Sequence, residues 1–235
     1  KRIRFALRIV RRLAGWMNWS FNVYPLLRPS LNNIYAKIRD ADRNRPWALV
    51  AINLAIQRDL DWARAHIETL PGVIMLRELE WSLAEADTTA FCDASFNGMG
   101  FWLPLSNQGF VFRLPSTASE EWITFWEALC VASAIGYLSN LYQKSRIVIY
   151  SDNQNTVDMF SSLHALPKYN EILKFSSDCL INRQLQLRVV HINGADNVVA
   201  DSLSRLNFTK AIHHSSGLSI DHFEPPRDAL GAVQL

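Results

Sequence analysis

The sequence has few cysteines, and they do not form a recognisable framework. Cys92, Cys130 and Cys179 are odd in number and far apart in a chain of 235 residues. Structural zinc sites need closely spaced ligand pairs, and disulfide frameworks need paired cysteines. We therefore expect neither feature, and we expect a reducing, intracellular compartment such as the cytoplasm or nucleus, where disulfides are rare.

Long apolar runs are also missing. No uninterrupted run approaches the roughly 18 residues that a membrane-spanning helix needs. Arginines within the first 12 residues interrupt any signal-peptide core. We expect no membrane partner and no small-molecule cofactor. Because the first residue is Lys1 and not methionine, we also expect a fragment of a longer polypeptide.

Acidic residues are absent from the beginning of the chain. Residues 1–12 contain six basic side chains and no acidic one, although the whole chain carries a net charge of only +2. Such a segment suits contact with phosphates. The alternative is a solvated helix whose apolar stripe is formed by Ile3, Leu7 and Val10.

What is present is enough for a substantial core, because 49% of the residues are hydrophobic. We expect residues 1–87 to be mainly helical, since apolar residues recur at helical spacing over residues 31–38 and 47–70. A short strand over residues 73–76 follows the Pro71-Gly72 stop.

Residues 88–206 have a different pattern. Apolar runs predict strands over residues 89–95, 98–103, 109–114, 146–151 and 184–192. Helices are expected from a cap at Ser119 to about residue 140, and over residues 153–163, 168–182 and 195–205. The order β-β-β-α-β-α-α-β-α predicts an α/β fold with a mixed five-stranded sheet flanked by helices. We expect residues 207–235 to form an extended linker.

Four carboxylates lie within these apolar elements. Asp93 and Asp152 end apolar strands, Glu127 lies inside an apolar helical stretch, and Asp201 belongs to the last expected helix. Unpaired buried carboxylates are costly, so we expect the four to converge. If the two strands are parallel neighbours, Asp93 and Asp152 lie about 5 Å apart. The alternative is that all four are surface carboxylates and helix caps.

A converging set of carboxylates has a specific chemical use. Hard oxygen ligands suit Mg²⁺, or Mn²⁺ in its place. Two such ions about 3.5–4 Å apart form the arrangement used for phosphodiester hydrolysis. The expected cofactor is therefore a pair of divalent ions held by Asp93, Glu127, Asp152 and Asp201.

The motifs around these acids resemble a known family. They are the segments at residues 92–100, 150–154 and 191–205, together with Glu127. Their order and spacing resemble type 1 ribonuclease H, above all the domain that follows reverse transcriptase in gypsy-like and DIRS-like retrotransposons. Residues 13–19 and 24–38 are similar to the thumb and connection segments of fungal retroelement polyproteins.

The resemblance implies a ribonuclease H-like fold, preceded by a thumb or connection region, that cuts the RNA strand of an RNA/DNA hybrid. Asp93 would bridge both metals, and Asp201 would complete the metal that activates water. Glu127 and Asp152 would complete the metal at the leaving group. The implied partners are the hybrid and an upstream polymerase domain of the same polyprotein; the polymerase Tyr-x-Asp-Asp motif itself is absent from the sequence.

Three further residues match positions with roles in the family. Asn97 and Gln154 correspond to contacts with the minor groove of the hybrid, where 2′-hydroxyls distinguish RNA from DNA. Their alternatives are turn formation for Asn97 and helix N-terminal hydrogen bonding for Gln154. His191 lies ten residues before Asp201, at the spacing of a catalytic histidine that shuttles protons. Its alternative is a plain strand position.

Two other functions compete with this one. A basic helical protrusion that grips the hybrid in cellular enzymes is missing between Asp152 and Asp201. The chain could therefore be a catalytically silent nucleic-acid-binding or scaffold module from a domesticated or decayed element. A DNA-cutting enzyme of the same fold is the third possibility, although such enzymes typically use three acids in another order.

Overall fold

The computed structural model describes residues 3–41, 45–69, 81–115 and 122–231. The chain divides into two compact units, one of residues 1–79 with 163–170 and one of residues 80–162 with 171–235. No helix in these described ranges is long and apolar enough to cross a membrane. The strand expected over residues 73–76 and the cap expected at Ser119 lie outside the described residues.

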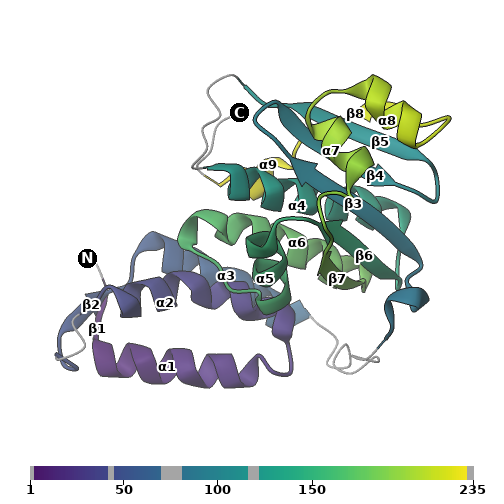
Figure 1. Cartoon of the computed structure of the whole chain (residues 1–235). Helices are drawn as coiled ribbons and strands as arrows, with labels where there is room; N and C mark the ends of the chain where they lie inside the picture. Colours follow the sequence, from purple (N-terminus) through teal and green to yellow (C-terminus); the bar gives the residue numbers. More distant parts are fainter. Residues whose placement is uncertain (1–2, 42–44, 70–80, 116–121, 232–235) are drawn as a thin grey trace. The chain divides into compact units, whose positions relative to one another are not determined.

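The larger unit is built on a six-stranded mixed sheet of order β7-β6-β3-β4-β5-β8 (Figure 1). Its strands are β3 (Thr88–Ala94), β4 (Gly98–Leu103), β5 (Gln108–Arg113), β6 (Arg146–Ser151), β7 (Gln186–His191) and β8 (Ser219–His222). The β3–β4 and β4–β5 pairs are antiparallel, whereas β3–β6, β6–β7 and β5–β8 are parallel. The mixed α/β sheet flanked by helices that the sequence predicts is confirmed, with six strands where five were expected, because β8 adds one at the edge.

Helices cover both faces of this sheet (Figure 1). They are α4 (Ile123–Leu141), α5 (Gln154–Ser162), α6 (Asn170–Arg183), α7 (Val198–Ser204), α8 (Phe208–His214) and α9 (Arg227–Leu230). A short 3₁₀ turn lies at Leu83–Glu85, and another at Pro167–Tyr169 belongs to the smaller unit. Helix α4 is apolar on all sides because it lies between the sheet and α6, where Gly136 meets the ring of Phe175. Glu127, the one charged residue of α4, is therefore buried.

The tail differs from its expected form. Residues 207–235 were expected to be an extended linker, but they contain α8, the sheet strand β8 and α9. The reason is burial: Ala211 and Leu218 pack into an apolar cluster with Val111, Val199 and Leu203. Strand β8 also covers the edge of β5, whose backbone groups would otherwise lack strand partners.

The register of the two central parallel strands positions the site. Strand β3 pairs with β6 so that Cys92 lies opposite Ser151. The core of β6, Ile147 to Ile149, is fully buried, as expected for a strand covered on both faces. Because the strands run in the same direction, the residues that follow Cys92 and Ser151 emerge side by side at one edge of the sheet.

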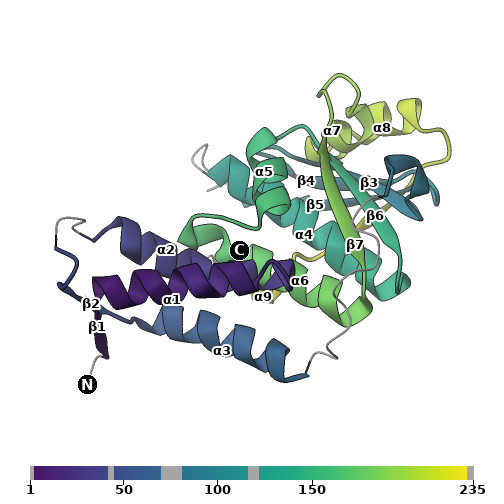
Figure 2. The same cartoon turned by 90° about the horizontal axis from the view of Figure 1, so that it is seen from below.

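The smaller unit is mainly helical, as expected, but it begins with a two-stranded sheet. Strand β1 (Arg4–Ala6) pairs with β2 (Leu49–Ala51), so the first part of the helix expected over residues 47–70 is extended. The reason is that β1 offers this segment backbone partners. The helices are α1 (Leu7–Ser20), α2 (Asn32–Arg39) and α3 (Leu54–Thr69), with a 3₁₀ segment at Pro25–Leu31 (Figure 2).

A buried polar network joins the segment 163–170 to the other parts of the smaller unit. The carboxylate of Asp59 accepts hydrogen bonds from the side-chain amides of Asn33 and Asn170, at 2.7 and 3.0 Å. Asn170 in turn accepts one from Asn32 at 2.8 Å. These bonds compensate for burying a carboxylate that is only 1% exposed.

Candidate metal centre

Three of the four predicted carboxylates come together in the larger unit. Asp93 lies near the end of β3, Asp152 directly follows β6, and Glu127 projects from α4. Each offers one oxygen, and these three oxygens lie within 4.8 Å of one another. The parallel register of β3 and β6 accounts for the first two, and the packing of α4 on the sheet brings in the third.

The cluster is buried and incompletely paired. Asp93 is 5% exposed and Glu127 is 4% exposed. Within the described residues, Oε2 of Glu127 is buried and has no hydrogen-bond partner. Such an oxygen costs free energy unless another group satisfies it. A divalent cation fits this position, because the donor set is hard oxygen and the three carboxylates concentrate negative charge.

The electrostatics of the cluster follow from its burial. Burial is the main effect that raises the pKa of Asp93 to about 7, with further increases from the charges of Asp152 and Asp201. Burial also raises the pKa of Glu127 well above its ordinary value, and the charge of Asp93 adds to this. The pKa of Asp152 rises for the same first reason. Protons would therefore compete with a divalent cation for these oxygens.

Asp201 lies beside this cluster but is engaged elsewhere. Its Oδ1 is 2.5 Å from Nε of Arg205, and its Oδ2 is 3.6 Å from Nζ of Lys210. Its negative charge nevertheless raises the pKa of both Asp93 and Asp152. The sequence predicted Asp201 as a site residue but did not predict the two basic side chains that contact it.

A serine that sequence reasoning missed supports the central carboxylate. The hydroxyl of Ser204 donates a hydrogen bond to Oδ2 of Asp93, and the carbonyl of Ser204 accepts one from Ser95 at 2.9 Å. Ser204 is three residues after Asp201 on α7, so the two share a helical face. That spacing was a usable signal.

Helix α7 can lie this close to the sheet because β4 carries glycine where they touch. A Cβ atom at Gly100 would meet Cβ of Leu203 at 2.6 Å and the backbone nitrogen of Ser204 at 2.7 Å. At the other end of the helix, Nδ2 of Asn197 donates to the carbonyl of Cys92 at 3.0 Å. Together these contacts hold α7 against the strand that carries Asp93.

The three remaining predicted residues have different surroundings. Asn97 is exposed in the turn between β3 and β4, and Gln154 is exposed at the start of α5, where its amide donates to Asp158 at 2.7 Å. Both positions follow the strand ends that carry Asp93 and Asp152. His191 ends β7, opposite Ser151, and its charge opposes the dominant effect of burial on the pKa of Asp152.

Comparisons with known proteins give no match by sequence and weak matches by structure. No protein-family model and no curated protein sequence matches the chain. The ribonuclease H1 of Halobacterium salinarum NRC-1 is similar with 14% identity and a TM-score of 0.39, over 55% of this chain and 98% of that one. None of these values assigns an activity to the chain.

Two structures of a foamy viral protease-reverse transcriptase are also similar, both in complex with double-stranded DNA. Their identities are 12% and 13%, with TM-scores of 0.33 and 0.26. The matches cover 80% and 79% of this chain but only 35% and 39% of the viral chains. This chain therefore spans little more than a third of those proteins.

Proposed function

We propose that the chain is a divalent-metal-dependent nuclease that hydrolyses the RNA strand of an RNA/DNA hybrid, as part of a retroelement reverse transcriptase. The observation that carries the proposal is the cluster of Asp93, Glu127 and Asp152, whose oxygens lie within 4.8 Å of one another. Oε2 of Glu127 has no hydrogen-bond partner among the described residues. A purely structural role for Glu127 would leave that oxygen uncompensated.

Two divalent ions would be coordinated by these carboxylates together. Asp93, Glu127 and Asp152 would hold them at the sheet, and Asp201 would add a ligand from α7 when it leaves Arg205. Bound Mg²⁺ or Mn²⁺ would supply charge stabilisation at the phosphate and an activated water. Ser204 orients the carboxylate of Asp93 through its hydroxyl.

The neighbouring polar residues suit a hybrid substrate. Asn97 and Gln154 are exposed at the ends of adjoining strands, where their amides can both donate and accept hydrogen bonds. A minor groove that displays 2′-hydroxyls offers both kinds of partner. His191 is exposed beside Asp152, where a ring nitrogen can take up or release a proton near the reacting phosphate.

The test is cleavage of labelled nucleic acids by the whole chain with Mg²⁺ or Mn²⁺. The substrates are an RNA/DNA hybrid, an all-DNA duplex and an all-RNA duplex of one sequence. We expect cutting of the RNA strand of the hybrid alone, loss of cutting with Asp93→Asn, and retention with Asp221→Asn. Asp221 is an exposed aspartate on β8 and serves as the matched control.

The outcomes separate the competing functions. Cutting of the all-DNA duplex would identify a DNA nuclease instead. Binding of the hybrid without cutting, equal in the chain and its Asp93→Asn variant, would identify a silent binding module. Cutting that survives Asp93→Asn would show that the carboxylate cluster is not the catalytic centre.

A further inference from the structure

The outer face of α1 carries two arginine side chains followed by two tryptophan side chains. Arg8, Arg12, Trp16 and Trp19 are spaced four, four and three residues apart, so they share one side of the helix. Trp47, from the loop before β2, extends this row, because the guanidinium of Arg8 lies 5.2 Å from the centre of its ring. We call these five residues the Arg/Trp row.

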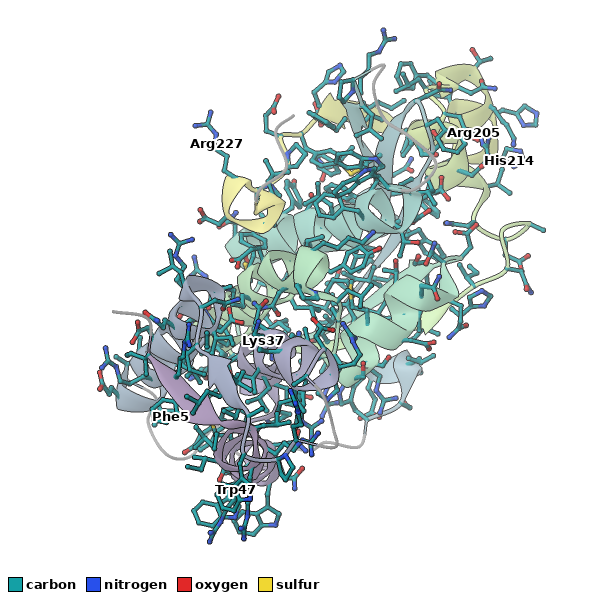
Figure 3. The ribbon with its side chains drawn as sticks, turned by 90° about the vertical axis from the view of Figure 1, so that its left-hand side faces the viewer. Phe5, Lys37, Trp47, Arg205, His214 and Arg227 are labelled. Atoms are coloured by element: carbon teal, nitrogen blue, oxygen red, sulfur yellow. The ribbon has the colours of Figure 1, made fainter. Side chains whose placement is uncertain are left out.

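The tryptophans of the row are unusually exposed. Trp16, Trp19 and Trp47 are 62%, 76% and 65% exposed, whereas tryptophan in folded proteins is highly buried on average. In Figure 3, Trp47 points away from its unit beside α1. The opposite face of α1 already supplies the core of this unit through Leu7, Val10 and Ala14. The row is therefore not needed to hold α1 in place.

The row is positively charged and preorganised. Arg12 lies 4.6 Å from the ring centre of Trp16, so each arginine lies over a tryptophan. Residues 1–39 contain nine lysines and arginines and no aspartate or glutamate. Among the described ion pairs of this unit, the arginines involved are Arg39, with Asp40, and Arg64, with Asp61 and Glu68.

A groove lies next to the row in the same unit. It has a volume of about 840 Å³ and is lined by Arg11, Arg39, Tyr35 and His164, among others. The rings of Tyr35 and His164 meet edge to face with their centres 6.0 Å apart. Arg11 and Arg39 give the lining of this groove a positive charge as well.

We propose that the Arg/Trp row is a binding surface for single-stranded nucleic acid, with bases stacked on the tryptophans and phosphates held by Arg8, Arg12 and Arg11. Exposed aromatic rings interleaved with arginine provide the two interactions that unpaired strands need. Bases in a duplex are already stacked on one another and cannot use the rings in this way. The inference does not depend on the nuclease function, because it concerns the smaller unit alone.

Charge favours this occupant over a protein. An apolar protein face would leave the arginines without partners, and it would have to desolvate them at a cost. A strand of nucleic acid supplies one phosphate per base, so each stacked ring brings a negative charge within reach of an arginine.

The experiment measures binding by the whole chain in EDTA, with no RNA present. The probes are a fluorescein-labelled oligothymidylate of about 20 nucleotides and a DNA duplex of equal length. We expect Trp16→Ala with Trp19→Ala to weaken single-strand binding about tenfold or more, with a much smaller effect on the duplex. We expect Arg8→Gln with Arg12→Gln to make the fall of log binding constant with log salt concentration less steep, by roughly 0.7 for each arginine.

Matched controls come from α3 in the same unit. Leu54→Ala removes an exposed apolar side chain, and Arg64→Gln removes an arginine that is already ion-paired. Neither should change binding. Thermal unfolding should be unchanged in the tryptophan variants, because their side chains lie outside the core.

Three results would overturn the proposal. If the tryptophan variants bound the single strand with unchanged affinity, base stacking on these tryptophans would be excluded. If the affinities for the single strand and the duplex fell equally, binding would be explained by non-specific electrostatic attraction. A chain that self-associates through this face, and becomes monomeric in the tryptophan variants with DNA affinity unchanged, would identify a surface between copies of the chain.

Discussion

The charge of Asp93 depends strongly on its surroundings. Burial raises its pKa to about 7 from the ordinary value of 3.8. The folded protein therefore holds a proton that the unfolded chain releases at lower pH. The contribution of this group to stability is present below about pH 4 and is lost as the pH rises towards about 7.

This gives a prediction for the metal-free protein. In EDTA, the unfolding temperature should fall between pH 4 and pH 7, and Asp93→Asn should remove much of that fall. At pH 8 the unfolding temperature of the variant should exceed that of the unsubstituted chain by several degrees, since each kcal/mol of stability shifts the unfolding temperature by about 2–4 °C. Calorimetry across this range tests it, with Asp221→Asn following the unsubstituted chain. An Asp93→Asn curve parallel to that of the unsubstituted chain would contradict the prediction.

Substituting Glu127 should have opposite effects on stability in the absence and in the presence of Mg²⁺, which allows a test of metal binding. Its pKa is raised well above the ordinary value by burial, so its charged form destabilises the metal-free protein. Glu127→Gln should therefore be more stable in EDTA at pH 8, yet gain less from Mg²⁺. A metal at 100 times its dissociation constant stabilises by about 2.7 kcal/mol.

The measurement is the unfolding temperature with and without Mg²⁺, at constant ionic strength set with NaCl. Equal Mg²⁺ stabilisation of the Glu127→Gln variant and the unsubstituted chain would exclude Glu127 as a ligand. Mg²⁺ should stabilise the protein more at pH 8 than at pH 5, because protons compete with the ion for carboxylates whose pKa values are raised.

Ser204 should act through Asp93. Its hydrogen bond lowers the pKa of that carboxylate against the effect of burial. Ser204→Ala should raise the pKa further and so weaken Mg²⁺ binding at pH 7 by about tenfold, as expected for a bond to a charged group.

Titration of cleavage against Mg²⁺ concentration at pH 7 and pH 8.5 tests this role, with a smaller deficit expected at the higher pH. Ser202→Ala is the matched control on the same helix, since the Ser202 hydroxyl donates to the backbone carbonyl of Val198 within α7 at 2.6 Å. A deficit independent of pH would point to a packing effect of Ser204 instead.

At the scale of elements, the contact between α7 and β4 positions two side chains of the candidate site. Helix α7 carries Asp201 and Ser204, and a methyl group at Gly100 would collide with its backbone. We expect Gly100→Ala to destabilise the protein by about 1–3 kcal/mol and to reduce cleavage beyond the loss of folded protein.

Denaturant unfolding and cleavage per folded molecule measure the two effects. Gly15→Ala is the control, because no atom lies within 4 Å of the added methyl and alanine favours the helix there. Full activity in Gly100→Ala would show that the site tolerates a displaced α7.

At the scale of the whole molecule, the tail completes the sheet. Removing residues 207–235 would expose the edge of β5 and the apolar surface under Ala211 and Leu218. We expect the truncated chain to unfold at a lower temperature and to self-associate, as measured by sedimentation velocity. Truncation after residue 231, which keeps every described element, should leave both properties unchanged. A monomeric, equally stable chain ending at residue 206 would contradict this role.

From the sequence alone, the order of strands and helices over residues 88–206 and the positions of Asp93 and Asp152 could be predicted. Both acids end apolar runs of strand length, and hydrophobic periodicity depends only on neighbours along the chain. The meeting of Asp93, Glu127 and Asp152 could be anticipated as well, because parallel strands end at one edge and four isolated buried carboxylates are too costly.

The tertiary structure decided the rest, since it depends on which distant surfaces meet. Strand β8 exists because β5 offers an open edge, and β2 exists because β1 lies beside it. The two basic side chains that contact Asp201 and the exposure of Trp16 follow from the docking of helices, which no local pattern encodes. Side-chain partners depend on packing in three dimensions, whereas periodicity reports only which face of an element is apolar.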